Sequence, residues 1–374
     1  MAMNYEQSII DIVLENGKLR PDRMALIFEL GSQPTSQYTY GELATEIRRL
    51  SGGLVERGLA GRQIALLFAP GTQFVLSLLA CLAAGCVAIP LAPIGRRRAR
   101  LQNLAEILSD QKPDCLLLDN SMAAQFASLL PELVANSICV LSYSQLDEAT
   151  GQFDPLTCSP DTLAVLQFTS GTTSRSKGVM ITHGNIIANE SMIQNKFGHD
   201  GDSHFVGWVP HFHDQGLFGN ILQPLFLGST CVLTSPATFI GKPTIWLQLI
   251  SKYRAHSSGG PNFGYDLLAD YATRRGVPDV DLSCWKVAFN GAERVRSTTL
   301  ERFSRCFAGV GFDKRAFLPC YGLAEATLVT VATPPWRTPL VRRFDSNALS
   351  RGLARPIHDG GGFALSSRAA ELSA

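Results

Sequence analysis

Short apolar segments of strand character alternate with segments of helical periodicity along most of the chain, and this alternation restricts the fold more than any other feature. Typical strand-like runs are IALLF at 64–68 and CVAIPLAP at 86–93, and the helix-like segment GTQFVLSLLACLAAG at 71–85 lies between them. Such β-α-β units build a mainly parallel sheet covered by helices, so the sequence predicts an α/β fold. Further strands are expected at 114–119, 138–143, 163–169, 204–209, 230–234 and 286–289, and further helices at 39–58, 101–108, 184–196, 244–255 and 298–307.

The length of the chain and one polar segment indicate how it is divided. A chain of 374 residues is long for a single hydrophobic core, which favours two packed subdomains. The turn-rich segment 144–160 is the best internal boundary. We therefore expect layered α/β subdomains at 1–155 and 156–332, followed by a tail at 333–374. The helix at 298–307 is expected to open with the capping box Thr298-x-x-Glu301.

Charge and composition argue against several classes of partner. A net charge of +1 gives no reason to expect nucleic acid, and the basic run at 96–100 is read as a solvated turn. The most apolar window, 74–92, is interrupted by Gly85 and Pro90, so no membrane span is predicted. Nine cysteines without a C-x-x-C pair, together with the absence of a secretory leader, indicate a cytoplasmic protein.

The segment LQFTSGTTSRSKGV at 166–179 is a candidate phosphate-binding loop, because a strand ends there in small hydroxyl residues and glycines. Backbone N–H groups freed by a glycine turn and Ser or Thr hydroxyls form a concave donor surface suited to phosphate oxygens. Lys177 adds a positive charge. The loop is not a Walker A motif, since Lys177 precedes Gly178 instead of following it. A Ser/Thr-rich surface turn is the alternative interpretation.

Four more polar clusters follow predicted strands or turns. WVPHFHDQGLFG at 208–219 contains His211, His213 and Asp214, and SSGGPNFGYDLL at 257–268 combines paired glycines with aromatic residues. AFNGAERVR at 288–296 and FLPCYGLAEATL at 317–328 each join a turn to an acidic residue. Taken singly, each cluster is as well explained by a turn or a packed aromatic. Open α/β sheets bind ligands at the carboxyl ends of their strands, so five such clusters together predict one ligand site there.

The ordered set FTSGTTSRSKGV, WVPHFHDQGLFG, SGGPNFGYDL, AFNGAERVR and CYGLAEATL resembles the adenylate-forming superfamily, and within it the fatty acyl-AMP ligases. The resemblance covers nearly the whole chain. It implies the large N-terminal α/β domain of such an enzyme without the small C-terminal domain, because nothing after Glu371 supplies the family's ribose-binding Asp motif, hinge and catalytic lysine. It also implies that 333–357 is the family insertion; a disordered linker is the alternative.

Carried over position by position, the resemblance implies the contacts of ATP. The residues that would hold its β- and γ-phosphates are Thr169, Ser170, Gly171, Thr172, Thr173 and Lys177. Those that would border adenine are Asn290, Gly291, Ala292 and Glu293, with Tyr321 stacking on the ring. Those that would line the α-phosphate region are Gly322, Leu323 and Ala324.

The resemblance also implies the remaining site residues. His213 would lie beside the reacting carboxylate with Asp214 supporting its loop, and these two are implied, with Lys177, as the catalytic residues. Glu325 would bind magnesium. The acyl pocket would begin at Trp208, Gly260, Phe263, Gly264 and Tyr265. The chain departs from the family pattern at Ser174, Ser176 and Arg294.

The implied activity is attack of a fatty acid carboxylate on the α-phosphate of ATP, with magnesium as cofactor. Acyl-adenylate and pyrophosphate are the products, and the acyl group passes to the phosphopantetheine thiol of an acyl carrier protein. Because the catalytic lysine is absent, the chain by itself is expected to bind these ligands but to adenylate poorly. Two alternatives stay open: an acyl-CoA ligase and a non-catalytic module that binds acyl-adenylate.

Overall fold

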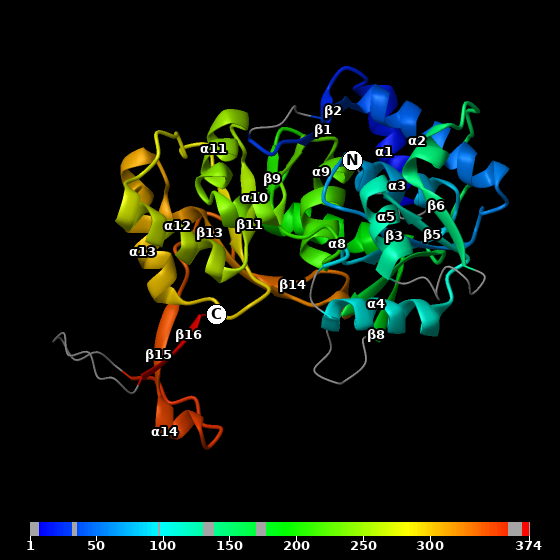
Figure 1. Ribbon diagram of the computed structural model, residues 1–374. Coiled ribbons are helices and arrows are strands. Elements are labelled where there is room, and N and C mark those ends of the chain that lie inside the picture. Colours follow the sequence, from blue (N-terminus) through cyan, green and yellow to red (C-terminus); the bar gives the residue numbers. More distant parts are fainter. Residues whose placement is uncertain are drawn as a thin grey trace.

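The computed structural model describes residues 7–31, 36–95, 98–129, 138–169, 177–357 and 369–373, which form two large sheets, the helices that cover them and a projecting arm (Figure 1). The larger sheet has eight strands, and its inner strands are all parallel to one another. Its two edge pairs, β1 with β2 and β13 with β14, are antiparallel. In spatial order the strands are β14 (Val329–Ala332), β13 (Phe317–Gly322), β12 (Val287–Asn290), β11 (Ser257–Gly260), β9 (Phe205–Gly207), β10 (Cys231–Leu233), β1 (Met24–Phe28) and β2 (Ser36–Thr39).

The second sheet has six strands and is parallel except for the hairpin of β7 and β8. In order these are β6 (Cys139–Ser142), β5 (Cys115–Leu118), β3 (Gln63–Leu67), β4 (Val87–Leu91), β7 (Leu163–Thr169) and β8 (Lys177–Thr182). The mainly parallel, layered α/β fold predicted from the sequence is confirmed. The division of the strands between the sheets does not follow their order in the chain. The early strands β1 and β2 belong to the larger sheet, whereas the later strands β7 and β8 belong to the smaller one. The division into subdomains at residue 155 stays a prediction.

Every helix predicted from the sequence is present, and the structure adds others. Those with a predicted counterpart are α2 (Tyr40–Glu56), α3 (Thr72–Ala83), α4 (Arg98–Gln111), α8 (His183–Phe197), α11 (Thr244–Tyr253) and α13 (Ser297–Phe307). The others are α1 (Ile9–Leu19), α5 (Asn120–Leu129), α7 (Tyr143–Asp147), α9 (Gln223–Leu227), α10 (Pro236–Gly241), α12 (Asn262–Arg275) and α14 (Ser346–Leu349). No helix in the described ranges is long and apolar enough to cross a membrane.

The capping box predicted for α13 is wrong. The helix begins at Ser297 with Arg296 as N-cap and without a side-chain cap, so Thr298 lies inside its first turn. Tertiary contacts explain the shift: the hydroxyl of Thr299 donates to Asp266 on α12 at 3.0 Å, and Arg302 pairs with the same carboxylate. These contacts, rather than a local cap, determine where α13 starts.

One hydrophobic core joins the two sheets. Residues of the larger sheet, such as Leu26 and Cys231, and residues of the smaller sheet, such as Leu66 and Leu117, belong to the same buried cluster. Helix α3 contributes to this cluster on nearly all sides, since only Gln73 in it is not buried. A helix that is apolar all round must lie within a protein interior. Two smaller clusters lie under α11, α12 and α13, and under α4 and α5.

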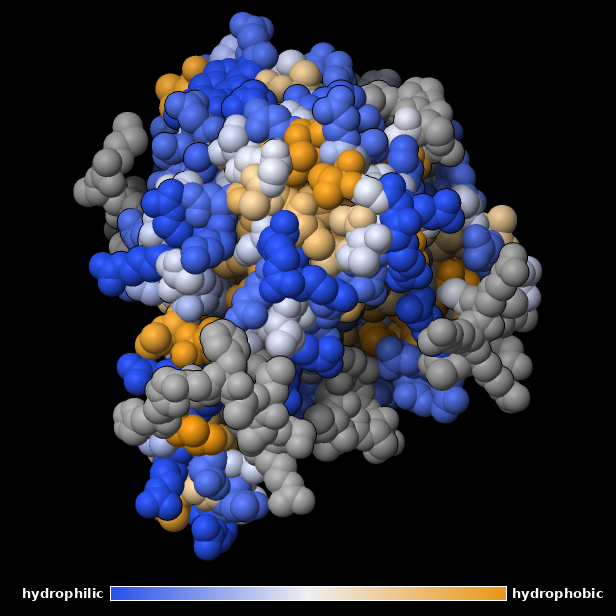
Figure 2. Space-filling model, turned by 90° about the vertical axis from the view of Figure 1, so that its left-hand side faces the viewer, coloured by the Kyte–Doolittle hydropathy of each residue, from blue (hydrophilic) through white to orange (hydrophobic). Residues whose placement is uncertain are grey.

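A small arm projects from the body (Figure 1). It consists of β15 (Val341–Asp345), α14 and β16 (Ala369–Ser373), with β15 and β16 antiparallel. Apolar side chains lie among hydrophilic ones on this arm (Figure 2), and Leu353 and Ile357 are exposed.

Three buried histidines make the folded chain sensitive to acid. Burial lowers the pKa of His183 to about 4 and lowers the pKa values of His199 and His211 to about 3. The cause is that charging an imidazole is unfavourable away from water. Each side chain regains a pKa of about 6.5 when the chain unfolds. The stability that these residues contribute is therefore fully present above about pH 6.5 and is lost as the pH falls toward the folded pKa values.

We expect His211→Asn to weaken the pH dependence of the free energy of unfolding. Between about pH 7.5 and about pH 5.5 the parent chain loses about 1.4 kcal/mol through His211, because the unfolded imidazole takes up a proton that the folded one excludes. Urea denaturation of both proteins at the two pH values measures this. A destabilisation that is the same at both pH values cancels when the two free energies of unfolding of each protein are subtracted. If both proteins lost the same free energy of unfolding between the two pH values, His211 would not be a source of the pH dependence.

Candidate active site

A pocket of about 550 Å³ lies where the carboxyl ends of strands from both sheets meet. The smaller sheet contributes the end of β7, and the larger sheet contributes the turns that follow β9, β11, β12 and β13. The structure thus brings together residues from all five predicted clusters. The predicted site residues that line this pocket are Thr169, Trp208, His213, Asp214, Phe263, Ala292, Gly322, Leu323, Ala324 and Glu325.

Two contacts hold the loop after β9 against elements of the smaller sheet. The side-chain nitrogen of Gln167, on β7, donates to the carbonyl oxygen of Phe212 at 2.7 Å. The ring of His211 packs on Phe74 of α3, with ring centroids 4.0 Å apart. Both Gln167 and His211 are buried, so these contacts are shielded from water. They place His213 and Asp214 opposite the end of β7.

The predicted phosphate loop is described only at its two ends. Thr169 is the last residue of β7, and Lys177 is the first residue of β8 and its register partner. Lys177 is exposed and does not line the pocket directly. Ser170, Gly171, Thr172 and Thr173 lie outside the described residues, as do Ser174 and Ser176.

His213 and Asp214 have shifted pKa values. Partial desolvation lowers the pKa of His213 and outweighs the opposite effect of the Asp214 carboxylate, although the side chain stays exposed at the mouth of the pocket. Burial also raises the pKa of Asp214, while the hydrogen bond from the backbone N–H of Gln215, at 2.7 Å, acts in the opposite direction. A neutral imidazole at pH 7 donates one hydrogen bond and accepts another without carrying a charge.

Asp214 is the N-cap of a π-helix, η1 (Gln215–Leu222). A π-helix is rare and commonly marks a functional position. Gly216 allows η1 to lie close to the loop after β9, because a Cβ there would collide with the carbonyl oxygen of Pro210. Two residues of η1, Gln215 and Gly219, line a second pocket beneath the first.

This second pocket is narrow and mainly apolar, with a volume of about 50 Å³. It shares Asp214, Gln215, Ala292 and Gly322 with the larger pocket, so the two are adjacent. Its other walls could not be predicted, because apolar residues in α8 and in strand interiors cannot be distinguished from core residues by sequence pattern alone. Its apolar lining includes Ile193, Phe197, Phe205, Phe289, Leu328 and Val329.

The segment 290–293 reaches both pockets through Ala292. Asn290 is fully buried, with its side-chain nitrogen 3.5 Å from Oδ1 of Asn262. Gly291 and Ala292 line the narrow pocket, and Ala292 has a positive φ of 64°, an uncommon conformation for a residue with a Cβ. Glu293 accepts a hydrogen bond from the backbone N–H of Phe263 at 2.7 Å.

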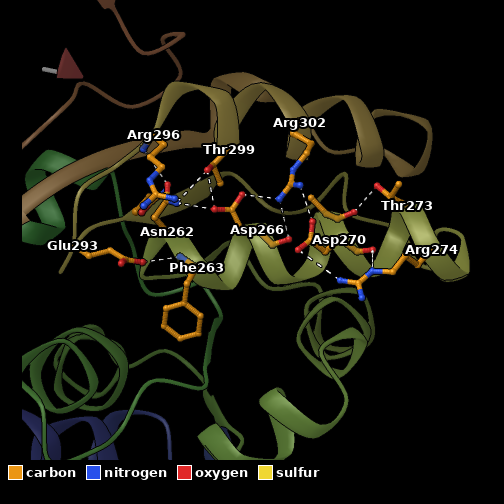
Figure 3. A network of polar contacts seen from close by, with 12 residues as sticks. Asn262, Phe263, Asp266, Asp270, Thr273, Arg274, Glu293, Arg296, Thr299 and Arg302 are labelled. Carbon is orange, nitrogen blue, oxygen red and sulfur yellow. Dashed lines mark hydrogen bonds and ion pairs between the residues drawn. The ribbon is translucent and has the colours of Figure 1, made fainter. Parts of the chain in front are cut away.

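The Glu293 contact belongs to a polar network between α12 and α13 (Figure 3). The N-cap of α12, Pro261, offers no side-chain cap, so the Glu293 carboxylate supplies an acceptor to its first turn. Farther along the helix, Arg302 forms ion pairs with Asp266 and Asp270 at 2.7 and 2.6 Å. The ring of Phe263 points away from this network in Figure 3 and lines the larger pocket.

The predicted acyl-binding residues separate into three groups. Trp208 and Phe263 line the larger pocket and contact each other edge to face, with ring centroids 5.6 Å apart. Gly260 and Gly264 lie against the Trp208 ring, since a Cβ at either position would lie 2.6 or 2.7 Å from it. Tyr265 does not reach either pocket: it is fully buried in the aromatic core, and its hydroxyl donates to the carbonyl oxygen of Phe289 at 2.8 Å.

The turn after β13 completes the site. Tyr321 is 62% exposed and lines both the narrow pocket and a surface hollow formed by 293–295, 319–321, 331–334 and 337–340. Glu325 is exposed on the rim of the larger pocket, close enough to Asp214 to affect its pKa. The part of the chain that the structure describes contains no cluster of three metal-ligating side chains. Magnesium commonly binds one or two carboxylates together with substrate phosphates and water, and Glu325 fits that requirement.

The sequence profile of the AMP-binding enzymes matches residues 14–345, most of the chain. The chain belongs to the AMP-binding enzyme family. This AMP-binding enzyme is 38% identical to medium-chain-fatty-acid–[acyl-carrier-protein] ligase JamA of Moorena producens over 328 residues, which are 86% of this chain and 55% of that protein. It is 47% identical to the corresponding ligase TtuA of Teredinibacter turnerae over 193 residues, which are 52% of this chain and 30% of that protein.

A solved structure has the same fold. The fatty acyl-adenylate ligase of L. pneumophila, determined in complex with acyl adenylate and pyrophosphate, superposes with a TM-score of 0.86 at 31% identity. The match covers 98% of this chain and 63% of that one. This AMP-binding enzyme thus spans less than two thirds of the length of each of these three relatives.

We expect Gly322→Ala to destabilise the protein. An added Cβ at Gly322 would collide with the carbonyl oxygen of Leu328, which already accepts from the N–H of Leu323 at 2.9 Å. Overpacking of this kind costs about 1–3 kcal/mol. Thermal unfolding measures the effect. The control is Gly309→Ala, where a Cβ meets nothing within 4 Å; equal melting temperatures for the two variants would contradict the close packing at Gly322.

Proposed function

We propose that the protein activates a fatty acid with ATP, forming acyl-adenylate and pyrophosphate. The observation that carries this proposal is the adjacency of the two pockets. The larger pocket, which combines polar groups such as Thr169 and His213 with apolar ones such as Trp208, shares Asp214, Ala292 and Gly322 with the narrow apolar pocket. A fatty acid requires both environments, with its carboxylate at the junction and its chain in the apolar pocket. The same chemistry is supported by the relatives, of which JamA is a fatty-acid ligase and the L. pneumophila ligase was determined with bound acyl adenylate.

The reaction needs alignment more than acid–base chemistry. A carboxylate is ionised at neutral pH, so its oxygen can attack the α-phosphorus directly. The new carboxylate–phosphorus bond forms as the bond to the pyrophosphate oxygen breaks, and the electron pair leaves with pyrophosphate. Orientation of the two anions and stabilisation of the charge on the phosphoryl group are the main catalytic requirements.

The residues of the chain fit these roles. We assign neutral His213 as the hydrogen-bond donor to the reacting oxygens, and Asp214 as the support that fixes its loop through Gln215. Thr169 to Thr173 and Lys177 would hold the β- and γ-phosphates. Gly322 to Ala324 would lie along the α-phosphate. Magnesium bound at Glu325 would neutralise phosphate charge.

The nucleotide base would lie beside the segment 290–293. We propose that the exposed ring of Tyr321 stacks on adenine, because it forms the border of both the narrow pocket and the surface hollow. Glu293 accepts a hydrogen bond from the backbone N–H of Phe263, and Phe263 lines the larger pocket. Binding of the base beside this segment would therefore also affect the wall of the larger pocket.

We further propose that the acyl group passes to the phosphopantetheine thiol of an acyl carrier protein, in the cytoplasm. The names of the relatives JamA and TtuA support a carrier protein as acceptor. The nine cysteines are all free thiols, as expected in a reducing compartment. Free coenzyme A is the alternative acceptor, and a non-catalytic role in binding acyl-adenylate is the alternative function.

A His213→Ala variant of the complete gene product tests the activity. We expect fatty-acid-dependent release of pyrophosphate from ATP to fall by about 10²- to 10³-fold, because a donor to the developing charge is lost. The matched control is His204→Ala, since His204 lies outside both pockets and its ring contacts the carbonyl oxygen of Tyr253. Pyrophosphate release that needs no fatty acid, or that is unaffected by His213→Ala, would contradict the proposal.

Mass spectrometry of the products identifies the acceptor. Incubation with both holo carrier protein and coenzyme A should give acyl carrier protein and little acyl-CoA. Mainly acyl-CoA would favour the alternative ligase. Tight binding of acyl-adenylate without pyrophosphate release by the complete gene product would favour the non-catalytic module.

A further inference from the structure

One polar side chain lies far inside the narrow pocket. Apart from the residues at its mouth and the turn of β13, the pocket is lined by aliphatic and aromatic groups and by His199. His199 directly follows the left-handed Gly198 that ends α8, and its backbone N–H donates to Gln194 at 3.0 Å. Its side chain is only 5% exposed. The function described above gives this histidine no role.

The strand register places His199 at the end of the pocket opposite the reacting groups. Its Nε2 lies 3.0 Å from Oγ of Ser257, the first residue of β11. Ser257 is in register with Phe205 and Val287, at the amino ends of their strands. The mouth of the pocket lies at the other end of these strands, beyond Gly260 and Asn290. Ser257, beside His199, and Gly260, at the mouth of the pocket, are three residues apart along β11, a distance of about 10 Å.

The hydrogen bonds of His199 are incomplete. Nε2 has Ser257 as partner, whereas Nδ1 is buried and has no partner among the described residues. Phe197 and Phe205 pack edge-on against the ring, with centroids 5.4 and 4.7 Å away, and His256 lies 6.0 Å away. An unpaired polar atom in such surroundings is unfavourable, and a ligand that pairs with it gains affinity.

The chemistry of this atom indicates which ligand group fits. Burial lowers the pKa of His199 to about 3, so the ring is neutral at pH 7 and attracts no carboxylate by charge. In one tautomer Nδ1 donates, and in the other it accepts, depending on how Nε2 pairs with the Ser257 hydroxyl. A hydroxyl can serve either tautomer, since it both donates and accepts.

We propose that His199 is a specificity residue that recognises the far end of the acid, and that the enzyme prefers an unbranched acid of medium length with a terminal hydroxyl over the methyl-ended acid of equal length. This inference rests on the proposed function, because it assumes that the narrow pocket holds the acyl chain. The narrowness of the pocket favours an unbranched chain, and the ring of His199 with Phe197 and Phe205 limits its length.

Matched pairs of acids test the inference on the complete gene product. ATP–pyrophosphate exchange is measured with octanoic, decanoic and dodecanoic acids and with their terminally hydroxylated counterparts. At the chain length that reaches His199, we expect kcat/KM to be about three- to tenfold higher for the hydroxylated acid. Substitution His199→Leu should reverse this ratio, whereas His199→Gln, which retains a polar group, should preserve part of it.

The control variant is Ile193→Val, which alters the apolar wall of the same pocket without changing a polar group. We expect it to leave the ratio between the paired acids unchanged. Methyl-ended acids preferred at every length by an active parent, or a hydroxyl preference that survives in His199→Leu, would overturn the role of His199 and leave the proposed function intact. A folded parent that exchanges pyrophosphate with none of the acids would overturn both.

Discussion

The shared hydrophobic core between the two sheets is the constraint on which the site depends. Helix α3 is apolar on almost every side, so it is stable only when protein surrounds it. The cluster to which it belongs contains strand residues of both sheets, which fixes the sheets against each other. As a consequence the end of β7, from one sheet, faces the turns after β9, β12 and β13, from the other. No single sheet carries the whole site.

Close packing then determines the shape of the site. Glycines at 260 and 264 leave space for the Trp208 ring, and Gly322 lets its turn approach the carbonyl oxygen of Leu328. The bond from Gln167 to Phe212 connects the two sheets at the pocket itself. These contacts allow the larger pocket, with its polar groups, to adjoin the narrow apolar pocket. A reaction that joins a fatty acid to a nucleotide requires this arrangement.

Much of the fold and part of the site could be predicted from the sequence, because strand and helix periodicities are local properties. The alternation located β3, β4, β5 and β7 and the helices α3 and α4, and the quoted motifs contain most residues of the larger pocket. Strand β11 was not predicted as a strand, because SSGG lacks the bulky residues typical of strands. The exchange of β1 and β2 into the larger sheet, the π-helix at Asp214 and the start of α13 depend on tertiary contacts. For the same reason the sequence does not show that Tyr265, expected at the acyl pocket, belongs to the core, nor does it show which residues line the narrow pocket.

A crystal structure of the chain with a non-hydrolysable acyl-adenylate analogue shows directly whether the two pockets form one site. We expect the phosphate mimic between His213 and Gly322, the adenine against Tyr321, and the acyl chain inside the narrow pocket along Phe205 and Phe289. An analogue whose acyl chain instead lies in the surface hollow at 331–334 and 337–340, with the narrow pocket still closed, would contradict the claim that the two adjoining pockets form one acyl-adenylate site.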